Sequence, residues 1–178
     1  SGNKGGQYHT TVDDFTLMDR YLDPGWRGHE AAGALFAALL ERFGEAHAMA
    51  TAAELSGWRE TSPGRLAEII VLDQFSRNIF RDTPAAFACD GMALVLAQEA
   101  VSSGSDQGMS ADERAFLYMP YMHSESPRVH EDALALFGGE GMKPHNLEFE
   151  VKHEAIIDRF GRYVSKIVWA RVVVHTPR

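Results

Sequence analysis

The densest group of polar residues in the sequence follows directly on an apolar run, Ile69-Ile70-Val71-Leu72. In a helix, at 100° per residue, these polar side chains fall within about 140° of one face. They are Asp73, Gln74, Arg77, Asn78 and Arg81. A helix segment that is apolar all round is buried. The polar face should therefore begin inside the protein, where it could bind a ligand.

Two interpretations of this polar face stay open. Arg77 is four residues from both Asp73 and Arg81, so the three can interact along the helix, and two guanidinium groups against one carboxylate leave a positive surplus. Guanidinium groups suit carboxylates and phosphates, which predicts a cleft for a small anion or an acidic peptide. The alternative is an internal ion-pair network that joins this helix to its neighbours, because buried charges are usually paired.

A second segment carries groups that could transfer protons. His123 and Glu125 follow Pro120, which should disturb a helix and leave side chains free to be aimed. With His153 they are the candidate catalytic acid–base residues. Their spacing matches no zinc motif, and the sequence has no P-loop and no strand-linked GxGxxG. We therefore expect no metal and no cofactor.

The last helix supplies a third group of candidates. His153 lies within its expected apolar face, formed by Phe149, Ile156, Ile157 and Phe160. A lone histidine there is more often a core residue than a ligand, and its ring would need a partner such as Asp73 or Glu125. Arg159 and Arg162 flank the end of this helix, where its dipole favours cations, and both are candidate ligand-binding residues.

Composition narrows the class of protein. The net charge of −8 argues against a nucleic-acid binder, which needs a basic field. With Cys89 as the single cysteine, no intramolecular disulfide can form, as in a reducing compartment. No apolar run approaches the roughly 20 residues that span a bilayer, and residues 1–7 lack the apolar core of a signal peptide. We expect a cytoplasmic protein without membrane contact.

Helix start and stop signals recur along the chain at short intervals. Hydroxyl–proline pairs indicate starts at Pro63, Pro84 and Pro127, and Ser110 with Glu113 forms a capping box. Asp90 and Asn146 are expected as further caps, and glycines such as Gly161 as stops. The predicted helices span residues 12–22, 30–43, 46–55, 63–81, 91–101, 111–119, 127–137 and 147–160, with one more helical turn after Pro84.

This pattern predicts an all-α fold with about eight or nine helices in antiparallel pairs, as a TPR-like array. The helices form a single domain at 12–162, after a flexible lead-in at 1–11 and before an atypical tail at 163–178. Within the tail, Ile167–Val174 is typical of a strand. A lone strand needs a partner for its backbone, and the apolar tail suggests a homodimer.

Three segments, Leu72–Asp90, Asp112–Glu125 and Glu154–Arg162, resemble the signature of a known family in the same order. Over about residues 35–162 the chain is similar to an uncharacterised, mainly bacterial family, domain of unknown function 924. The resemblance implies an all-helical, TPR-like fold and no established activity. The family's recurrent polar positions match Asp73, Gln74, Arg77, Asn78, Arg81, Asp90, His123, Ser124, Glu125, His153, Asp158, Arg159 and Arg162.

The chain departs from the family pattern at two places. Ser76 stands where family members tend to have proline. After Arg162 the chain continues Tyr163-Val-Ser-Lys, and a Pro-His-Arg-Asn segment typical of the family is missing. If that segment lines the family's site, the site is incomplete here.

Two functions from different classes follow. The first is a binding module for a small anion or a peptide partner, as helical arrays often are. The second is a small enzyme in which His123, Glu125 and His153 transfer protons and Arg77 and Arg81 fix an anionic substrate. Convergence of the buried ionisable groups on one place would favour the enzyme, and an exposed apolar groove would favour the binding module.

Overall fold

The computed structural model describes residues 41, 43–81 and 83–163. The chain divides into two compact units, Ser1–Gly44 and Glu45–Arg178, and nearly all described residues belong to the second unit. The lead-in at 1–11, the predicted helix at 12–22, most of the helix at 30–43 and the strand-like tail lie outside the described residues. The predicted domain boundaries therefore stay a prediction.

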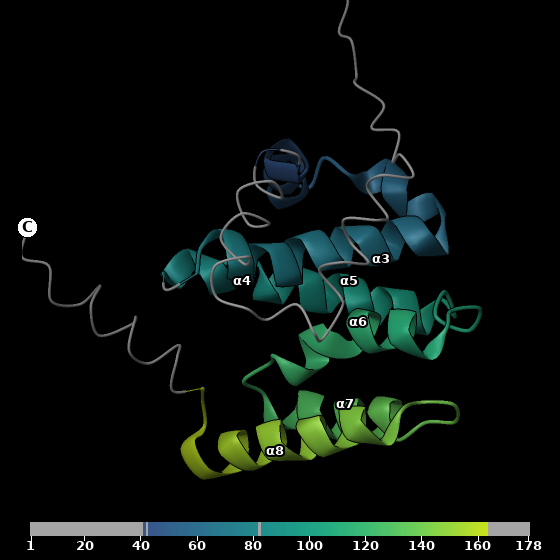
Figure 1. Cartoon of the computed structure of the whole chain (residues 1–178), viewed down its shortest axis with the longest axis vertical. Coiled ribbons are helices and arrows are strands. Elements are labelled where there is room, and N and C mark those ends of the chain that lie inside the picture. The colour runs from purple at the N-terminus through teal and green to yellow at the C-terminus, as the bar shows by residue number, and fades with distance from the viewer. Residues whose placement is uncertain (1–40, 42, 82, 164–178) are drawn as a thin grey trace, which may run out of the picture. The chain divides into compact units, whose positions relative to one another are not determined.

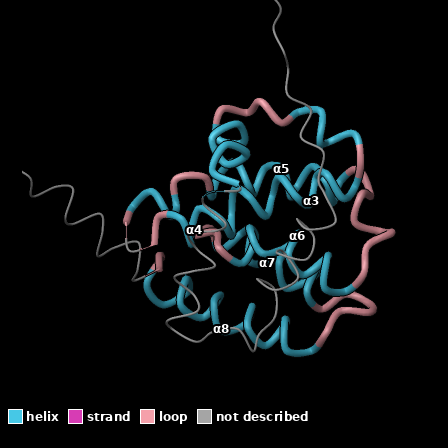
Figure 2. The backbone as a smooth tube through the Cα atoms, turned by 45° about the horizontal axis from the view of Figure 1, so that its top comes forward, coloured by secondary structure: helices cyan, strands magenta, loops and turns pink. Residues whose placement is uncertain are grey.

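The described residues of this unit are helical and contain no strand, as the tube in Figure 2 shows. A helical segment at 45–51 comes first. It is followed by η2 (Ser56–Glu60), α3 (Ser62–Ile70), η3 (Val71–Phe75), α4 (Ser76–Ile79), η4 (Pro84–Phe87), α5 (Asp90–Ser102), α6 (Ala111–Met122), α7 (Pro127–Phe137) and α8 (Pro144–Phe160). The all-α class is confirmed for this part of the chain, while the total of eight or nine helices and the TPR-like arrangement are not confirmed.

Most of the predicted helix starts are confirmed, because each depends on local chemistry. Thr61 accepts a hydrogen bond from the backbone amide of Gly64 at the start of α3. Ser110 and Glu113 make both bonds of a capping box at the start of α6. The helix α8 ends at Gly161, whose φ of 70° is a left-handed conformation that glycine adopts without strain.

Three local predictions were wrong. Asp90 does not cap α5: Cys89 stands at the cap, and Asp90 lies in the first turn, where it pairs with Arg77. Asn146 does not cap α8, which begins earlier at Pro144 because proline fits the first turn of a helix. Pro120 does not end α6, which continues to Met122. The cost of its missing amide bond is offset by packing, since Pro120 is buried.

The predicted central helix at 63–81 contains a π-helix. The segment η3 separates α3 from α4, and a π turn leaves helix carbonyls without their usual amide partners. Two side chains donate to carbonyls at this place: Arg77 Nη1 to the Asp73 oxygen at 3.0 Å, and Asn78 Nδ2 to the Gln74 oxygen at 2.6 Å. The polar face therefore stabilises the π-helix, a feature that periodicity alone did not indicate.

The core lies where α3 and η3 pack against α5 and α6, while α6 contacts α7 and α7 contacts α8 (Figure 1). Its largest fully buried apolar side chains are Ile69, Leu72, Phe75, Leu117 and Ile157. The apolar run before Asp73 is thus buried, as predicted. This packing holds η3 and the end of α6 close together, although they are about 50 residues apart in sequence.

The predicted buried face of α8 was wrong for its two phenylalanines and right for Ile157. Phe149 and Phe160 are 52% and 53% exposed, while the buried residues of the helix are Glu150 and Ile157. Amphipathicity favours burial of the phenylalanines, but Glu150 is buried because it pairs with a histidine of α7. A tertiary ion pair has therefore decided the orientation of this helix.

One helical stretch, Pro84–Ser102, is long and apolar enough to cross a membrane by length and composition alone. Core helices of soluble proteins meet the same criterion, and α5 packs against both α3 and α6. This stretch also carries Asp90, which is paired with Arg77. The expected absence of membrane contact and the cytoplasmic location stay predictions.

Candidate functional site

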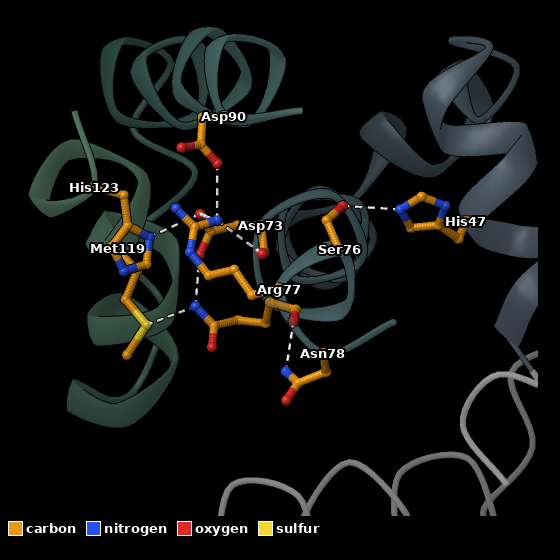
Figure 3. Close-up of polar contacts among 9 residues, drawn as sticks. His47, Asp73, Ser76, Arg77, Asn78, Asp90, Met119 and His123 are labelled. Atoms are coloured by element: carbon orange, nitrogen blue, oxygen red, sulfur yellow. Dashed lines mark hydrogen bonds and ion pairs between the residues drawn. The ribbon is translucent and has the colours of Figure 1, made fainter. Parts of the chain in front are cut away.

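Asp73 is the centre of the polar cluster drawn in Figure 3. Its side chain is 1% exposed. One carboxylate oxygen, Oδ1, lies 2.8 Å from Arg77 Nη1 and 2.8 Å from His123 Nδ1, and the other accepts from Gln74 Nε2 at 2.5 Å. A buried carboxylate with three donors is fixed in position and well suited to orient the groups that it binds.

The environment of Asp73 keeps it ionised. Burial alone would raise the pKa of its carboxyl, but His123, Arg77 and Gln74 together hold the pKa below its usual value. An ionised carboxylate only accepts hydrogen bonds, so Nδ1 of His123 must carry the proton in this contact. The Asp73 carboxylate therefore fixes both the tautomer and the orientation of the imidazole.

His123 is placed by the end of α6. It stands at the C-cap of that helix, and its amide donates to the Met119 carbonyl at 3.0 Å. Its side chain is 19% exposed, in contrast to the buried Asp73. The pair thus joins a carboxylate inside the protein to an imidazole at its edge. This is the arrangement by which enzymes orient a histidine for proton transfer.

The charges around Arg77 differ from the predicted surplus. Its Nη1 lies 2.8 Å from an Asp73 oxygen and 2.8 Å from an Asp90 oxygen, and its guanidinium lies over the Phe87 ring at 5.7 Å. Arg81 is exposed beyond the end of α4. At the cluster one guanidinium thus faces two carboxylates. The sequence left two interpretations open, a cleft in which Arg77 binds a ligand and an internal ion-pair network. The observed contacts of Arg77 are those of an ion-pair network.

A second carboxylate–histidine pair joins α7 to α8. His130 Nδ1 lies 2.5 Å from Glu150 Oε1, its Nε2 lies 2.9 Å from the Ser124 carbonyl oxygen, and both side chains are fully buried. Burial lowers the pKa of His130, but the carboxylate of Glu150 and the carbonyl of Ser124 outweigh it, so the net shift is upward. Both ring nitrogens face acceptors, as in an imidazolium ion.

The other candidate catalytic residues meet around Tyr163. Glu125 Oε1 accepts from the Tyr163 amide at 2.9 Å, and the His153 ring stands edge-on to the Tyr163 ring with centroids 5.7 Å apart. His153 Nδ1 donates to the Phe149 carbonyl of its own helix at 2.8 Å, so its partner is neither Asp73 nor Glu125. Glu125 and His153 are thus close to the His123 segment without contacting Asp73.

The remaining predicted residues divide into two groups. Gln74 and Asn78 belong to the cluster, since Gln74 Nε2 also contacts Met119 Sδ at 3.1 Å and Asn78 bonds the Gln74 carbonyl. Asp158, Arg159 and Arg162 are exposed at the end of α8. Arg159 lies over the Phe160 ring at 5.1 Å. The role of these exposed residues in ligand binding stays a prediction.

Sequence reasoning missed the pairing of His130 with Glu150 and the contacts of Tyr163. His130 gave no local signal, because its partner is 20 residues away. The spacing of seven between Glu150 and Ile157 places both on one helix face, and this was the available clue. A second buried histidine, His47, bonds the Ser76 hydroxyl at 2.8 Å, and burial lowers its pKa, so Ser76 has a structural partner.

The comparisons with known proteins agree with this helical architecture. The model of a family described as bacterial protein of unknown function (DUF924) matches residues 26–166. The chain belongs to this family. A solved protein of unknown function from Agrobacterium tumefaciens is 32% identical, with a TM-score of 0.79 over 88% of this chain and 89% of that chain. A search among curated proteins gave no match.

Membership in the DUF924 family thus establishes the relationship and carries no activity with it. The described residues hold no group of three or more histidine, cysteine, aspartate or glutamate side chains placed to bind a metal ion.

Proposed function

We propose that the protein is a small enzyme in which His123 transfers a proton to and from a bound small molecule. The observation that carries this proposal is the 2.8 Å contact between His123 Nδ1 and the buried carboxylate of Asp73. A carboxylate on one ring nitrogen leaves the other, Nε2, in the tautomer that accepts a proton.

The chemistry follows from the charges of the cluster. When Nε2 takes a proton from a substrate, the imidazole becomes an imidazolium beside the ionised Asp73, which stabilises it. Arg77 and Gln74 hold Asp73 in place, so the carboxylate does not have to reorganise during the transfer.

The same charges weaken the alternative, a binding module with an arginine-rich cleft for a small anion or acidic peptide. Arg77 already faces Asp73 and Asp90, so an anion would have to compete with two carboxylates. The predicted peptide partner and homodimer stay predictions.

The test is a screen of small metabolites in which binding and turnover are measured separately. Binding is detected as a rise of the thermal unfolding temperature, and turnover by NMR of the same mixtures. We expect at least one compound that is converted by the wild-type protein. Its conversion should fall by about 10²- to 10⁴-fold in His123→Gln, because the proton-transferring group is lost. Asp73→Asn should also lower the rate, since it no longer fixes the reactive tautomer.

The matched control is His145→Gln, which replaces an exposed histidine near the start of α8. Its turnover should equal that of the wild type. A compound that binds the wild type and His123→Gln equally and is converted by neither would contradict the enzyme and favour the binding module. Conversion that is unchanged in His123→Gln would contradict the role of His123.

A further inference from the structure

Tyr163 lies where the chain leaves α8, and it contacts the segment that carries His123. Its hydroxyl donates to the Met122 carbonyl at 2.6 Å, and its amide donates to Glu125 Oε1 at 2.9 Å. These two anchor points stand on both sides of His123 in the sequence. A residue that follows α8 therefore holds the connection between α6 and α7.

His130 holds the same connection from α7. Its Nε2 lies 2.9 Å from the Ser124 carbonyl and 3.4 Å from the Tyr163 hydroxyl. Hydrogen bonds from His130 of α7 or from Tyr163 are thus accepted by three residues around His123, which are Met122, Ser124 and Glu125. The backbone around His123 is fixed by side chains that come from outside α6.

The end of α6 needs such support because of Pro120. Proline has no amide proton, so it cannot donate to the carbonyl of Phe116, and the last turn of α6 lacks one of its backbone bonds. His123 stands at the C-cap of this weakened turn. A helix end with fewer backbone bonds moves more easily, and a shift of about 1 Å would break the contact with Asp73.

We propose that Tyr163 is the positioning residue of the His123 site. Its hydrogen bonds to the Met122 carbonyl and the Glu125 carboxylate fix the position of the backbone at His123. From this position the imidazole contacts Asp73. The catalytic meaning of this role rests on the function proposed above, whereas the effect on the geometry of His123 can be measured without any substrate.

The electrostatic surroundings of Tyr163 fit this role. Burial together with Glu150 and Glu125 raises the pKa of its phenol, while the guanidinium of Arg77 acts in the opposite direction. The phenol therefore keeps its proton at neutral pH and can donate it to the Met122 carbonyl.

The test compares Tyr163→Phe with Tyr118→Phe in the full chain. Tyr118 also donates a 2.6 Å hydrogen bond from a phenol, to Asp106 Oδ2, a residue that precedes α6 and lies outside the segment 122–126. Each variant loses the hydrogen bond that its phenol donates and should lose similar stability. The readout is the imidazole ¹H–¹⁵N spectrum, with the Nδ1–H signal of His123 assigned from its loss in His123→Gln.

We expect Tyr163→Phe to shift the His123 Nδ1–H signal and Tyr118→Phe to leave it in place. Hydrogen exchange at the amides of His123 and Ser124 should also rise, by roughly three- to tenfold, in Tyr163→Phe alone. An unchanged signal with unchanged exchange in Tyr163→Phe would overturn the proposal, and so would equal changes in both variants. If the signal shifts but no compound is converted, the positioning role stands and the proposed function fails.

Discussion

The described part of the chain contains two carboxylate–histidine pairs that are alike in chemistry and opposite in surroundings. In the pair of His130 and Glu150 both side chains are fully buried, and the second ring nitrogen of the histidine meets the Ser124 carbonyl. In the pair of Asp73 and His123 the carboxylate is as deeply buried, but 19% of the histidine side chain is exposed.

The difference shows that a carboxylate beside a histidine does not by itself indicate a reactive site. A pair that is buried at both ends and bonded on both ring nitrogens joins two helices, and its proton has no route to a substrate. In a pair that is buried at the carboxylate end and partly exposed at the histidine end, the carboxylate fixes an imidazole that solvent can reach. Exposure of the histidine, rather than the pairing, separates the two roles.

The largest expected effect comes from breaking the buried pair. Glu150→Ala should lower the free energy of unfolding by about 3–5 kcal/mol, because it leaves an imidazole buried without its counter-charge. Urea unfolding measures this loss. The control is Glu148→Ala, an exposed glutamate on the same helix, which should change the free energy by less than about 0.5 kcal/mol. A cost for Glu150→Ala no larger than that of Glu148→Ala would contradict a structural role.

The second prediction separates the pairs by pH. The pKa of Asp73 is lowered on folding, so its contribution is present above the unfolded value near pH 3.9 and is lost as the pH falls through the folded value. The pKa of His130 is raised, so its contribution is present below about pH 6.5 and is lost as the pH rises through the folded value.

Unfolding free energies measured from roughly pH 3 to pH 9 should therefore depend on Asp73 at the acid end of the range and on His130 at the alkaline end. Asp73→Asn should flatten the acid side of the profile, and Glu150→Gln should flatten the alkaline side. Wild-type slopes that persist on both sides in these variants would show that other groups govern the pH dependence.

The smallest effect is expected on the stability of the open pair. His123→Gln should change the free energy of unfolding by about 1 kcal/mol, because the buried Asp73 keeps Arg77 and Gln74 as partners and loses one hydrogen bond. His130→Gln should cost several times more. Comparable losses in urea unfolding would remove the distinction between the two pairs and, with it, the argument that His123 is retained for chemistry.

Local signals predicted the starts of most helices because each start depends on neighbouring residues. Thr61 and Ser110 cap as expected, and Gly161 ends α8. The polar set of the central helix was also found, since its members lie within nine residues of each other. The π-helix within it was not predicted, because a period of 3.6 residues was assumed throughout.

The sequence predicted the main residues of the candidate site but not the contacts between them. Asp73, Arg77 and His123 were named from the sequence, but the bond between Asp73 and His123 spans 50 residues. The predicted partner of Arg77 within its own helix is confirmed, whereas its second carboxylate, Asp90, had been assigned to a helix cap. Long-range pairing cannot be derived from spacing along one helix.

The sequence by itself determined that the described part of this chain is helical, where its helices begin and which helix carries the buried polar face, because caps, prolines and periodicity act within a few residues. Only the tertiary structure decided which carboxylate meets which histidine. It also turned Glu150 inward and Phe149 outward on α8, against the apolar pattern of that helix. The physical reason is that a buried charge is tolerated only beside its partner, and partners are brought together by packing.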